Sequence, residues 1–205
     1  MCSASAIKQG NKRGDSTISK DFSSVVNVAV GGPQATGKSS ALRIVSQQRP
    51  EFDVIFFGEQ LPNDFLALAP SEIQRLRARV ARRIASKLAH RDSVKIVDLH
   101  YLDLREANPK IQPADFLSCF DLLVFLTARP EVLLERRMAD TTRNDRSITL
   151  TDIKADVDAH LEYHDELVDV GMNAILIDCQ AQPLDVALEL LRRIDAAVTY
   201  QCCRR

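Results

Sequence analysis

The segment whose residue types most directly indicate chemistry is Gly32 to Ser39, which reads GPQATGKS. It satisfies the pattern G-x-x-x-x-G-K-[ST], with a β-branched run before it and an apolar helical pattern after it. Glycines let the backbone curl so that successive N–H groups point inward, and the dipole of the following helix adds positive potential. A turn that needed only positive φ would explain neither the lysine nor the serine. The segment therefore predicts a phosphate-binding loop.

Within this loop, Lys38 and Ser39 have separate expected roles. Lys38 is expected to reach the β- and γ-phosphates of ATP, and the Ser39 hydroxyl is expected to ligate Mg²⁺. ATP and Mg²⁺ are therefore the expected cofactors. The residues expected to bind the nucleotide are Gly32, Gln34, Ala35, Thr36, Gly37, Lys38, Ser39 and Ser40.

A second candidate metal ligand is Asp98, which ends the apolar run in VKIVDLH. A carboxylate at the end of a strand can hold Mg²⁺ directly or through water. The alternative is that Asp98 caps a turn, as aspartate often does. Leu99 follows it in place of a glutamate that could polarise an attacking water, which disfavours a motor-type ATPase. The guanine-reading pattern Asn-Lys-x-Asp is absent after the loop, which disfavours a GTPase. Phosphoryl transfer to a small molecule remains.

Two arginine-rich segments follow. Between Ser71 and Asp92 there are seven cations and only two acids, so an anion could lie nearby, although a solvated helix face is the alternative. The second segment, LLERRMADTTRNDRSIT, is too polar in its latter half for a core element. Its arginines Arg137, Arg143 and Arg146 could neutralise transferring phosphates as a lid closes and excludes water. Cations that favour a helix C-terminus are the alternative for Arg136 or Arg137.

The elements that would position these residues alternate between strands and helices. Five short aliphatic runs are expected as strands, at 25–30, 52–57, 94–98, 122–126 and 174–178. Helices are expected after the loop, around the stripe of Ile73, Leu76, Val80, Ile84 and Leu88, and at about 130–138, 150–170 and 184–198. This alternation predicts an α/β fold with a parallel sheet covered by helices on both faces.

Length and composition fit one such domain. The 205 residues suffice for a single sizeable core, and the apolar runs are far shorter than a membrane span. We expect a flexible tail at 1–23, a kinase domain at 24–200 with a lid at about 138–149, and a short tail at 201–205. Five cysteines without metal-type spacing suggest a reducing cytoplasm. The formal net charge of −1 argues against a nucleic-acid partner, and none is expected.

From the loop to the last strand, the chain resembles the archaeal-type adenylate kinases, a branch of the P-loop nucleoside monophosphate kinases. The resemblance rests on the phosphate-binding loop, Phe57-Gly58, Ala81 to Ala85, Val97 to His100, and Arg136 to Asn144. It implies a P-loop NTPase fold with a five-stranded parallel sheet in the order 2-3-1-4-5. It implies Mg-ATP as donor, and it allows a homo-oligomer. It also places Arg82 near the acceptor, and Arg137 and Arg143 near the transferring phosphate.

Departures from the family pattern concern the acceptor. Glu59 stands where the family has a small hydroxyl residue, the loop after His100 differs, and the order Asn144-Asp145-Arg146 is inverted. A carboxylate at Glu59 would repel an acceptor phosphate but could hold a hydroxyl or an amine. Gly58, Glu59, Arg82 and His100 are the expected acceptor-side residues, although His100 could instead serve packing.

The sequence therefore predicts an ATP-dependent kinase of the nucleoside monophosphate type. Two alternatives remain open: a P-loop kinase of a non-nucleotide metabolite, and a nucleotide-binding regulatory protein with little transfer activity. His160 and His164, spaced i, i+4, could in principle form a metal site, but their helix is acidic and lacks the catalytic H-E-x-x-H pattern, which disfavours one.

Overall fold

The computed structural model describes residues 25–62, 64–104, 109–141 and 147–203 of the chain. Its centre is a five-stranded sheet in the order β2-β3-β1-β4-β5, and every neighbouring pair is parallel. The strands are β1 (Asn27–Gly31), β2 (Asp53–Phe56), β3 (Lys95–Asp98), β4 (Leu122–Thr127) and β5 (Ala174–Asp178). The predicted strands and their order are confirmed, with ends that differ from the expected ones by two residues or fewer.

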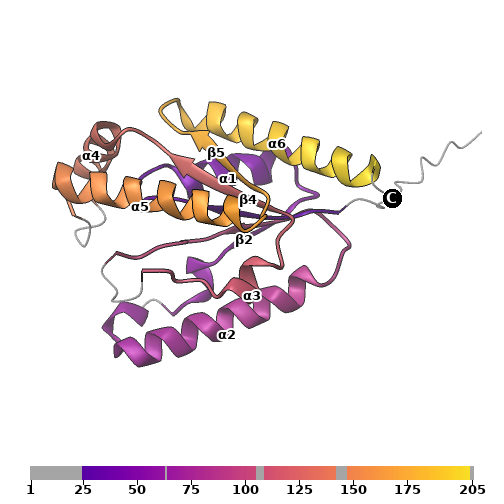
Figure 1. The fold of residues 1–205 in the computed structure, drawn as a ribbon, viewed down its shortest axis with the longest axis horizontal. Coiled ribbons are helices and arrows are strands. Elements are labelled where there is room, and N and C mark those ends of the chain that lie inside the picture. Colours follow the sequence, from indigo (N-terminus) through magenta and orange to yellow (C-terminus); the bar gives the residue numbers. More distant parts are fainter. Residues whose placement is uncertain (1–24, 63, 105–108, 142–146, 204–205) are drawn as a thin grey trace, which may run out of the picture.

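Helices cover both faces of the sheet (Figure 1). Helices α1 and α6 lie on one face, and helices α2 and α3 lie on the other. The bounds are α1 (Lys38–Gln48), α2 (Pro70–Leu88), α3 (Ala114–Leu117), α4 (Pro130–Ala139), α5 (Leu150–Asp169) and α6 (Pro183–Cys203), with short 3₁₀ turns η1 (Gly58–Gln60) and η2 (Phe65–Ala67). Helix α6 extends to Cys203, so three residues of the expected tail at 201–205 are helical. None of the described helices is both long and apolar enough to cross a membrane.

The helix ends follow local chemistry. Proline occupies the first helical position of α2 and α4, where its missing N–H leaves no hydrogen bond unmade. The Thr149 hydroxyl accepts a hydrogen bond from the Asp152 N–H at the start of α5. Gly171, with φ of 83°, follows the end of α5, where glycine commonly ends a helix.

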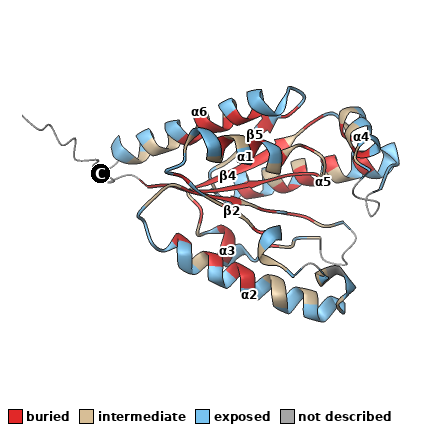
Figure 2. Cartoon of the chain, turned by 180° about the vertical axis from the view of Figure 1, so that it is seen from behind, coloured by how far each residue is buried: buried red, intermediate tan, exposed pale blue. Residues whose placement is uncertain are grey.

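Two hydrophobic clusters fill the space between the sheet and its helices. On one face Val28 and Val30 pack with side chains of α1 and α6, and on the other face Ala29 packs with those of α2. Because side chains alternate along a strand, β1 contributes to both clusters and is buried on both faces. Figure 2 shows the buried residues concentrated in the sheet and on the helix faces that cover it.

Tyr101, in the segment that follows β3, packs against β1, the strand that leads into the phosphate-binding loop. Its ring stacks on Phe125 with centroids 4.2 Å apart, and its hydroxyl donates to the Ala29 carbonyl at 3.2 Å. A side chain at Gly31 would place a Cβ 2.3 Å from this ring. The absence of a side chain at Gly31 therefore allows β1 and the segment after β3 to approach each other.

Candidate active site

The phosphate-binding loop, residues 32–39, connects β1 to α1, includes the first two residues of α1, and has the curled backbone that the sequence predicts. Gly32 and Gly37 have φ of 137° and 87°, in a region that side chains disfavour. A Cβ at Gly32 would also lie 2.1 Å from the Leu126 carbonyl oxygen. Ala35 has a φ of 69°, which is uncommon for a residue other than glycine. The loop therefore holds a backbone conformation with local strain, a feature that clusters at ligand sites.

Lys38 is folded into this loop. Its ammonium donates to the carbonyl oxygens of Gly32 at 2.8 Å and Pro33 at 2.9 Å, and the residue is only 6% exposed. The Thr36 hydroxyl donates to the same Pro33 carbonyl at 3.1 Å. The lysine charge is therefore held inside the loop, at the start of α1, where an anion would also meet backbone N–H groups.

The Ser39 hydroxyl donates to the Asp98 carboxylate at 2.8 Å, which joins the start of α1 to the end of β3. Burial raises the pKa of the Asp98 carboxyl, while the Lys38 charge and the Ser39 hydrogen bond act in the opposite direction. One hydroxyl and one carboxylate are hard oxygen donors, which suit Mg²⁺ because this ion usually keeps water and phosphate oxygens as further ligands. The two predicted metal ligands are thus adjacent, and their chemistry fits the ion.

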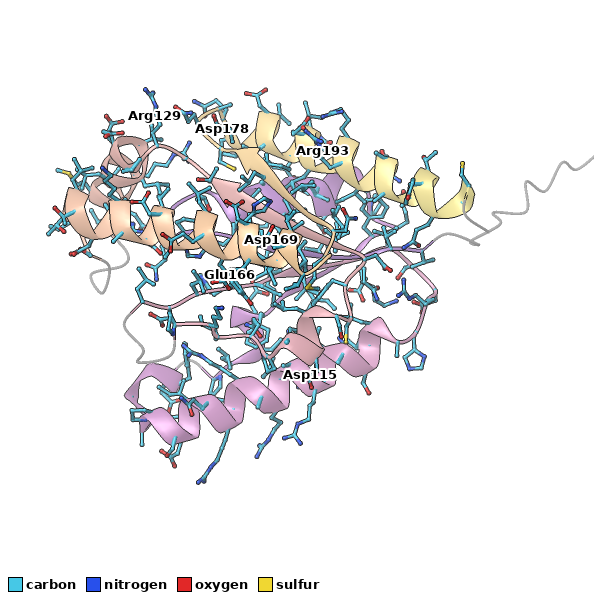
Figure 3. All side chains as sticks on the ribbon, viewed as in Figure 1. Asp115, Arg129, Glu166, Asp169, Asp178 and Arg193 are labelled. Atoms are coloured by element: carbon cyan, nitrogen blue, oxygen red, sulfur yellow. The ribbon has the colours of Figure 1, made fainter. Side chains whose placement is uncertain are left out.

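Arg136 and Arg137, two adjacent arginines of α4, both contact the phosphate-binding loop. Arg136 donates to the Cys179 carbonyl at 2.8 Å, to the Ala181 carbonyl at 3.3 Å and to the Thr36 carbonyl at 3.4 Å. It therefore bridges the loop and the chain just after β5. In Figure 3 Arg129, which precedes α4, and Asp178, which ends β5, lie at the same side of the molecule. The sequence assigns Arg136 no site role and allows it as a cation that favours a helix C-terminus; the partners it has here are distant in the chain.

Arg137 is buried and has three kinds of partner. It donates to the Gln34 carbonyl of the loop at 3.3 Å, to the Ser147 carbonyl at 3.2 Å and to the Asp156 carboxylate of α5 at 2.8 Å. The structure therefore places Arg137 against the loop and shows Asp156 as a partner that sequence reasoning missed; the role of Arg137 at a transferring phosphate stays a prediction. No sequence signal distinguishes Asp156 from the other acids of α5.

Asp156 has a second neighbour in His160. The His160 Nδ1 lies 2.7 Å from the Asp156 carbonyl oxygen and 3.3 Å from its carboxylate. Burial alone would raise the pKa of Asp156, but the hydrogen bonds and charges of His160 and Arg137 together hold this pKa below its usual value. Over the described ranges, no group of three or more His, Cys, Asp or Glu side chains is placed to hold a metal. The His160 and His164 pair therefore forms no such group.

The acceptor-side residues are more dispersed. Gly58 and Glu59 form the turn η1 after β2, and the exposed Glu59 pairs with Arg43 of α1 at 3.2 Å. His100 follows β3, is exposed, and accepts a hydrogen bond at its carbonyl from the Gln112 side chain at 3.1 Å. Arg82 lies on the exposed side of α2 and donates to the Ala78 carbonyl of its own helix at 3.4 Å.

Two of the predicted lid residues cannot be placed. Arg143 and Arg146 lie outside the described residues, and so does the Thr142-Arg143-Asn144 part of the resemblance.

Ser40 is the remaining residue of the predicted nucleotide site. It is exposed and lies in the first turn of α1 with Lys38 and Ser39. The structure therefore brings the residues predicted for the phosphate donor close together, whereas the residues predicted for the acceptor lie apart.

Comparison with known proteins identifies the fold. No protein-family model matches the chain, and no curated protein sequence matches it. Among solved structures, a sugar kinase from Janibacter sp. HTCC2649 matches with a TM-score of 0.56 at 15% identity, over 85% of this chain and 97% of that one. A shikimate kinase from Aquifex aeolicus matches with a TM-score of 0.56 at 16% identity, over 83% and 96%.

Two further solved structures are similar to the same extent. A gluconokinase from Sinorhizobium meliloti 1021 matches with a TM-score of 0.55 at 16% identity, over 86% of this chain and 97% of that one. The YorR protein of Bacillus subtilis, in complex with phosphorylated GDP, matches with a TM-score of 0.56 at 16% identity, over 82% and 95%. The chain therefore has the P-loop kinase fold. The finer resemblance to adenylate kinases stays a prediction.

Proposed function

We propose that the protein is an ATP-dependent kinase that phosphorylates a hydroxyl group of a small, non-nucleotide metabolite. The observation that carries this proposal is the contact between Ser39 and Asp98 beside Lys38, at the point where the P-loop, β3 and α1 meet. This arrangement supplies a phosphate-binding loop and two oxygen ligands for Mg²⁺ without the glutamate that would activate water. It suits transfer to an acceptor better than hydrolysis.

The proposed roles follow from position. The P-loop amides and Lys38 bind the β- and γ-phosphates, and Ser39 and Asp98 hold Mg²⁺. Bound Mg²⁺ would neutralise charge on the phosphate oxygens as it develops. The acceptor oxygen forms a bond to the γ-phosphorus while the bond from that phosphorus to the bridging oxygen breaks, and ADP leaves with that oxygen. The hydroxyl proton passes to a nearby base, for which Asp98 and Glu59 are the candidates.

The proposed acceptor class rests on Glu59 and on the neighbours' names. A carboxylate just after β2 can accept a hydrogen bond from a hydroxyl group, whereas it would repel the phosphate of a nucleotide acceptor. Three of the similar solved structures are described as sugar, shikimate and gluconate kinases. These acceptors share hydroxyl groups on a small carbon skeleton.

A nucleoside monophosphate acceptor is the second candidate. The Arg136 to Asn144 block resembles the lid of adenylate kinases, and the YorR structure holds phosphorylated GDP. In this version Arg137, Arg143 and Arg146 stabilise the transferring phosphate, with the segment at about 138–149 as a lid of the domain at 24–200.

A nucleotide-binding regulatory protein with little transfer activity is the third candidate. It would keep the same contacts to the phosphates of ATP.

One assay distinguishes these functions. The full chain is mixed with Mg-ATP, and ADP formation is measured with each nucleoside monophosphate and with a panel of sugars and hydroxy acids. The proposal predicts that at least one hydroxylated metabolite raises ADP formation well above the acceptor-free rate, while AMP does not. Stimulation by monophosphates alone would favour the second candidate. If ATP binds but no acceptor raises ADP formation, the nucleotide-binding protein with little transfer activity would be favoured.

A further inference from the structure

The outer side of α2 carries a row of cations that the proposed function does not use. We call Arg75, Arg79, Arg82, Arg83 and Lys87 the cationic stripe, and all five are exposed. In Figure 3 long side chains project from α2 on the side away from the sheet, and Figure 2 shows that side as exposed. The stripe therefore faces solvent along most of the helix.

Helical spacing explains this direction. Val80, Ala81 and Ile84 are buried against the sheet and define the inner side of α2. Arg75, Arg79 and Arg82 follow one another at intervals of four and three residues, so they line one side of the helix, about 5 Å apart along its axis. A rotation of about 100° per residue places that line opposite the inner side. The remaining two cations, Arg83 and Lys87, flank the line on one side.

The stripe is not neutralised by its own helix. Glu72, the one acid of α2, accepts a hydrogen bond from the Ala69 N–H at 3.1 Å and so caps the helix start. Within the described part of the chain, no carboxylate forms an ion pair with any of the five stripe residues, and Arg83 donates a hydrogen bond to the neutral Gln60 side chain at 2.5 Å. By contrast, Arg91 just beyond the helix pairs with Asp121 at 2.6 Å. Like charges at i, i+3 and i, i+4 destabilise an isolated helix, so this pattern favours a partner that neutralises it.

The chemistry of the same side limits the class of partner. The exposed residues of α2 are Pro, Ser, Glu, Gln, Arg, Ala and Lys, with no aromatic and no large aliphatic side chain among them. Trp and Tyr, which often anchor a protein partner, are absent from this side, and an amphipathic helix needs apolar side chains to insert into a membrane surface. Guanidinium groups match phosphate oxygens with two parallel hydrogen bonds, and a nucleic-acid backbone presents such phosphates in series.

From this combination we infer that the cationic stripe binds the phosphodiester backbone of a nucleic acid without reading its sequence. One stripe residue, Arg82, is expected from the sequence on the acceptor side, but the proposed function gives it no role, so the inference does not depend on the kinase proposal. It also revises the expectation drawn from the net charge of −1, which averages over the whole chain. Local charge, rather than the total, governs contact with a polyanion.

The test measures binding of the full chain to fluorescein-labelled single-stranded RNA of about 20 nucleotides, longer than a typical binding site. Fluorescence anisotropy is recorded from about 25 to about 200 mM KCl, and duplex RNA and duplex DNA form two further arms. The test variant combines Arg75→Gln, Arg79→Gln and Arg82→Gln. The matched control combines Lys154→Gln, Arg192→Gln and Arg193→Gln, which changes the net charge equally but elsewhere, on α5 and α6.

We expect the test variant to bind at least about tenfold more weakly at low salt, with a salt slope shallower by about 2 for three lost phosphate contacts on single strands. The control should stay within about twofold of the parent. Parental affinity in the test variant, an equal loss in the control, or no binding by the parent at low salt would each overturn the inference. So would competition by poly-glutamate as effective as competition by unlabelled RNA.

Folding of the test variant is checked by circular dichroism and thermal melting. Its helix content and melting midpoint should not fall, because the substitutions relieve repulsion between like charges. If the triple variant does not fold, Arg79→Gln alone takes its place, with an expected loss of about threefold and a salt slope shallower by about 0.7. An unchanged affinity in that folded single variant would also overturn the inference.

Discussion

The guanidinium of Arg137 lies 2.8 Å from the carboxylate of Asp156, and their side chains are only 4% and 19% exposed. The two residues belong to α4 and α5, and the same guanidinium also donates to the Gln34 carbonyl of the P-loop. A single buried ion pair therefore links the loop to both helices. An arginine in this position is held by its neighbours before any ligand arrives, which reduces the ordering needed on binding.

Removing the Asp156 carboxylate should destabilise the protein. Asp156→Ala leaves the Arg137 charge buried without its partner, so we expect the free energy of unfolding to fall by about 3 kcal/mol. Urea unfolding at neutral pH measures this change. Asp158→Ala, an exposed acid on the same helix, is the control and should have little effect. An equal loss in the two variants would contradict the importance of the pair.

The pair of Arg137 and Asp156 also predicts that the stability of the protein depends on pH. Because His160 and Arg137 hold the pKa of Asp156 below its usual value, the stabilisation is fully present above that usual value. It is lost as the pH falls through the lowered pKa. The stability difference between the parent and Asp156→Ala should therefore shrink on acidification below about pH 4. Urea midpoints of both proteins, measured over a pH series, test this, and a difference that grew in acid would contradict it.

Asp98→Asn should separate stability from activity. Burial raises the pKa of Asp98, so its ionisation opposes folding as the pH rises from the usual aspartate value through the raised one. The asparagine variant does not ionise, so it does not lose stability in this way and should melt at or above the parental temperature at neutral pH. Its phosphoryl transfer should nevertheless fall, on the order of 10–100-fold, because the variant removes a proposed ligand of Mg²⁺. A variant that transferred phosphate at the parental rate would remove Asp98 from the site.

Lys38→Ala tests the donor site as a whole. In the proposed function the Lys38 ammonium binds the β- and γ-phosphates, so transfer should fall on the order of 100-fold or more. Lys154→Ala, which removes an exposed lysine of α5, is the control and should retain activity. Initial rates of ADP formation with the best acceptor measure both. Retained activity in Lys38→Ala would contradict every donor-side assignment.

Glu59→Ser tests the acceptor class. Removing this carboxylate should raise kcat/KM for a nucleoside monophosphate relative to a hydroxylated metabolite by about tenfold, because charge repulsion is relieved. Glu51→Gln removes another exposed carboxylate that is paired with an arginine, Arg49, and serves as the control. If the ratio of the two kcat/KM values were the same in parent and variant, Glu59 would not discriminate between acceptors.

The cysteines should differ in reactivity. Burial raises the pKa of the Cys179 thiol to about 12, so little thiolate is present at neutral pH. Cys202 and Cys203, at the end of α6, are exposed. Brief treatment with iodoacetamide followed by peptide mass spectrometry should label the last two and leave Cys179 unmodified. Urea-unfolded protein is the control, in which Cys179 should react as well.

The residues near one another in the chain could be interpreted from sequence alone. The P-loop follows from glycines, a lysine and a serine within eight positions, because its backbone conformation depends on local φ and ψ preferences. The strands and most helix ends follow from apolar periodicity and capping residues, which are also local. The strand order depended on the resemblance to a family, since periodicity within a strand does not say which strand lies next to it.

Only the tertiary structure decided which distant groups meet. Arg136 reaches Cys179 and Arg137 reaches Asp156, and no local pattern selects those partners from the many acids and carbonyls in the chain. The cation cluster at 71–92 could have been a ligand site or a solvated face, and packing of α2 determined its orientation. Burial of Val80, Ala81 and Ile84 turns one side of that helix inward, so Arg75, Arg79 and Arg82 point outward. Local preference thus determined the loop and the elements, and the packing of the core determined how the charges are paired and directed.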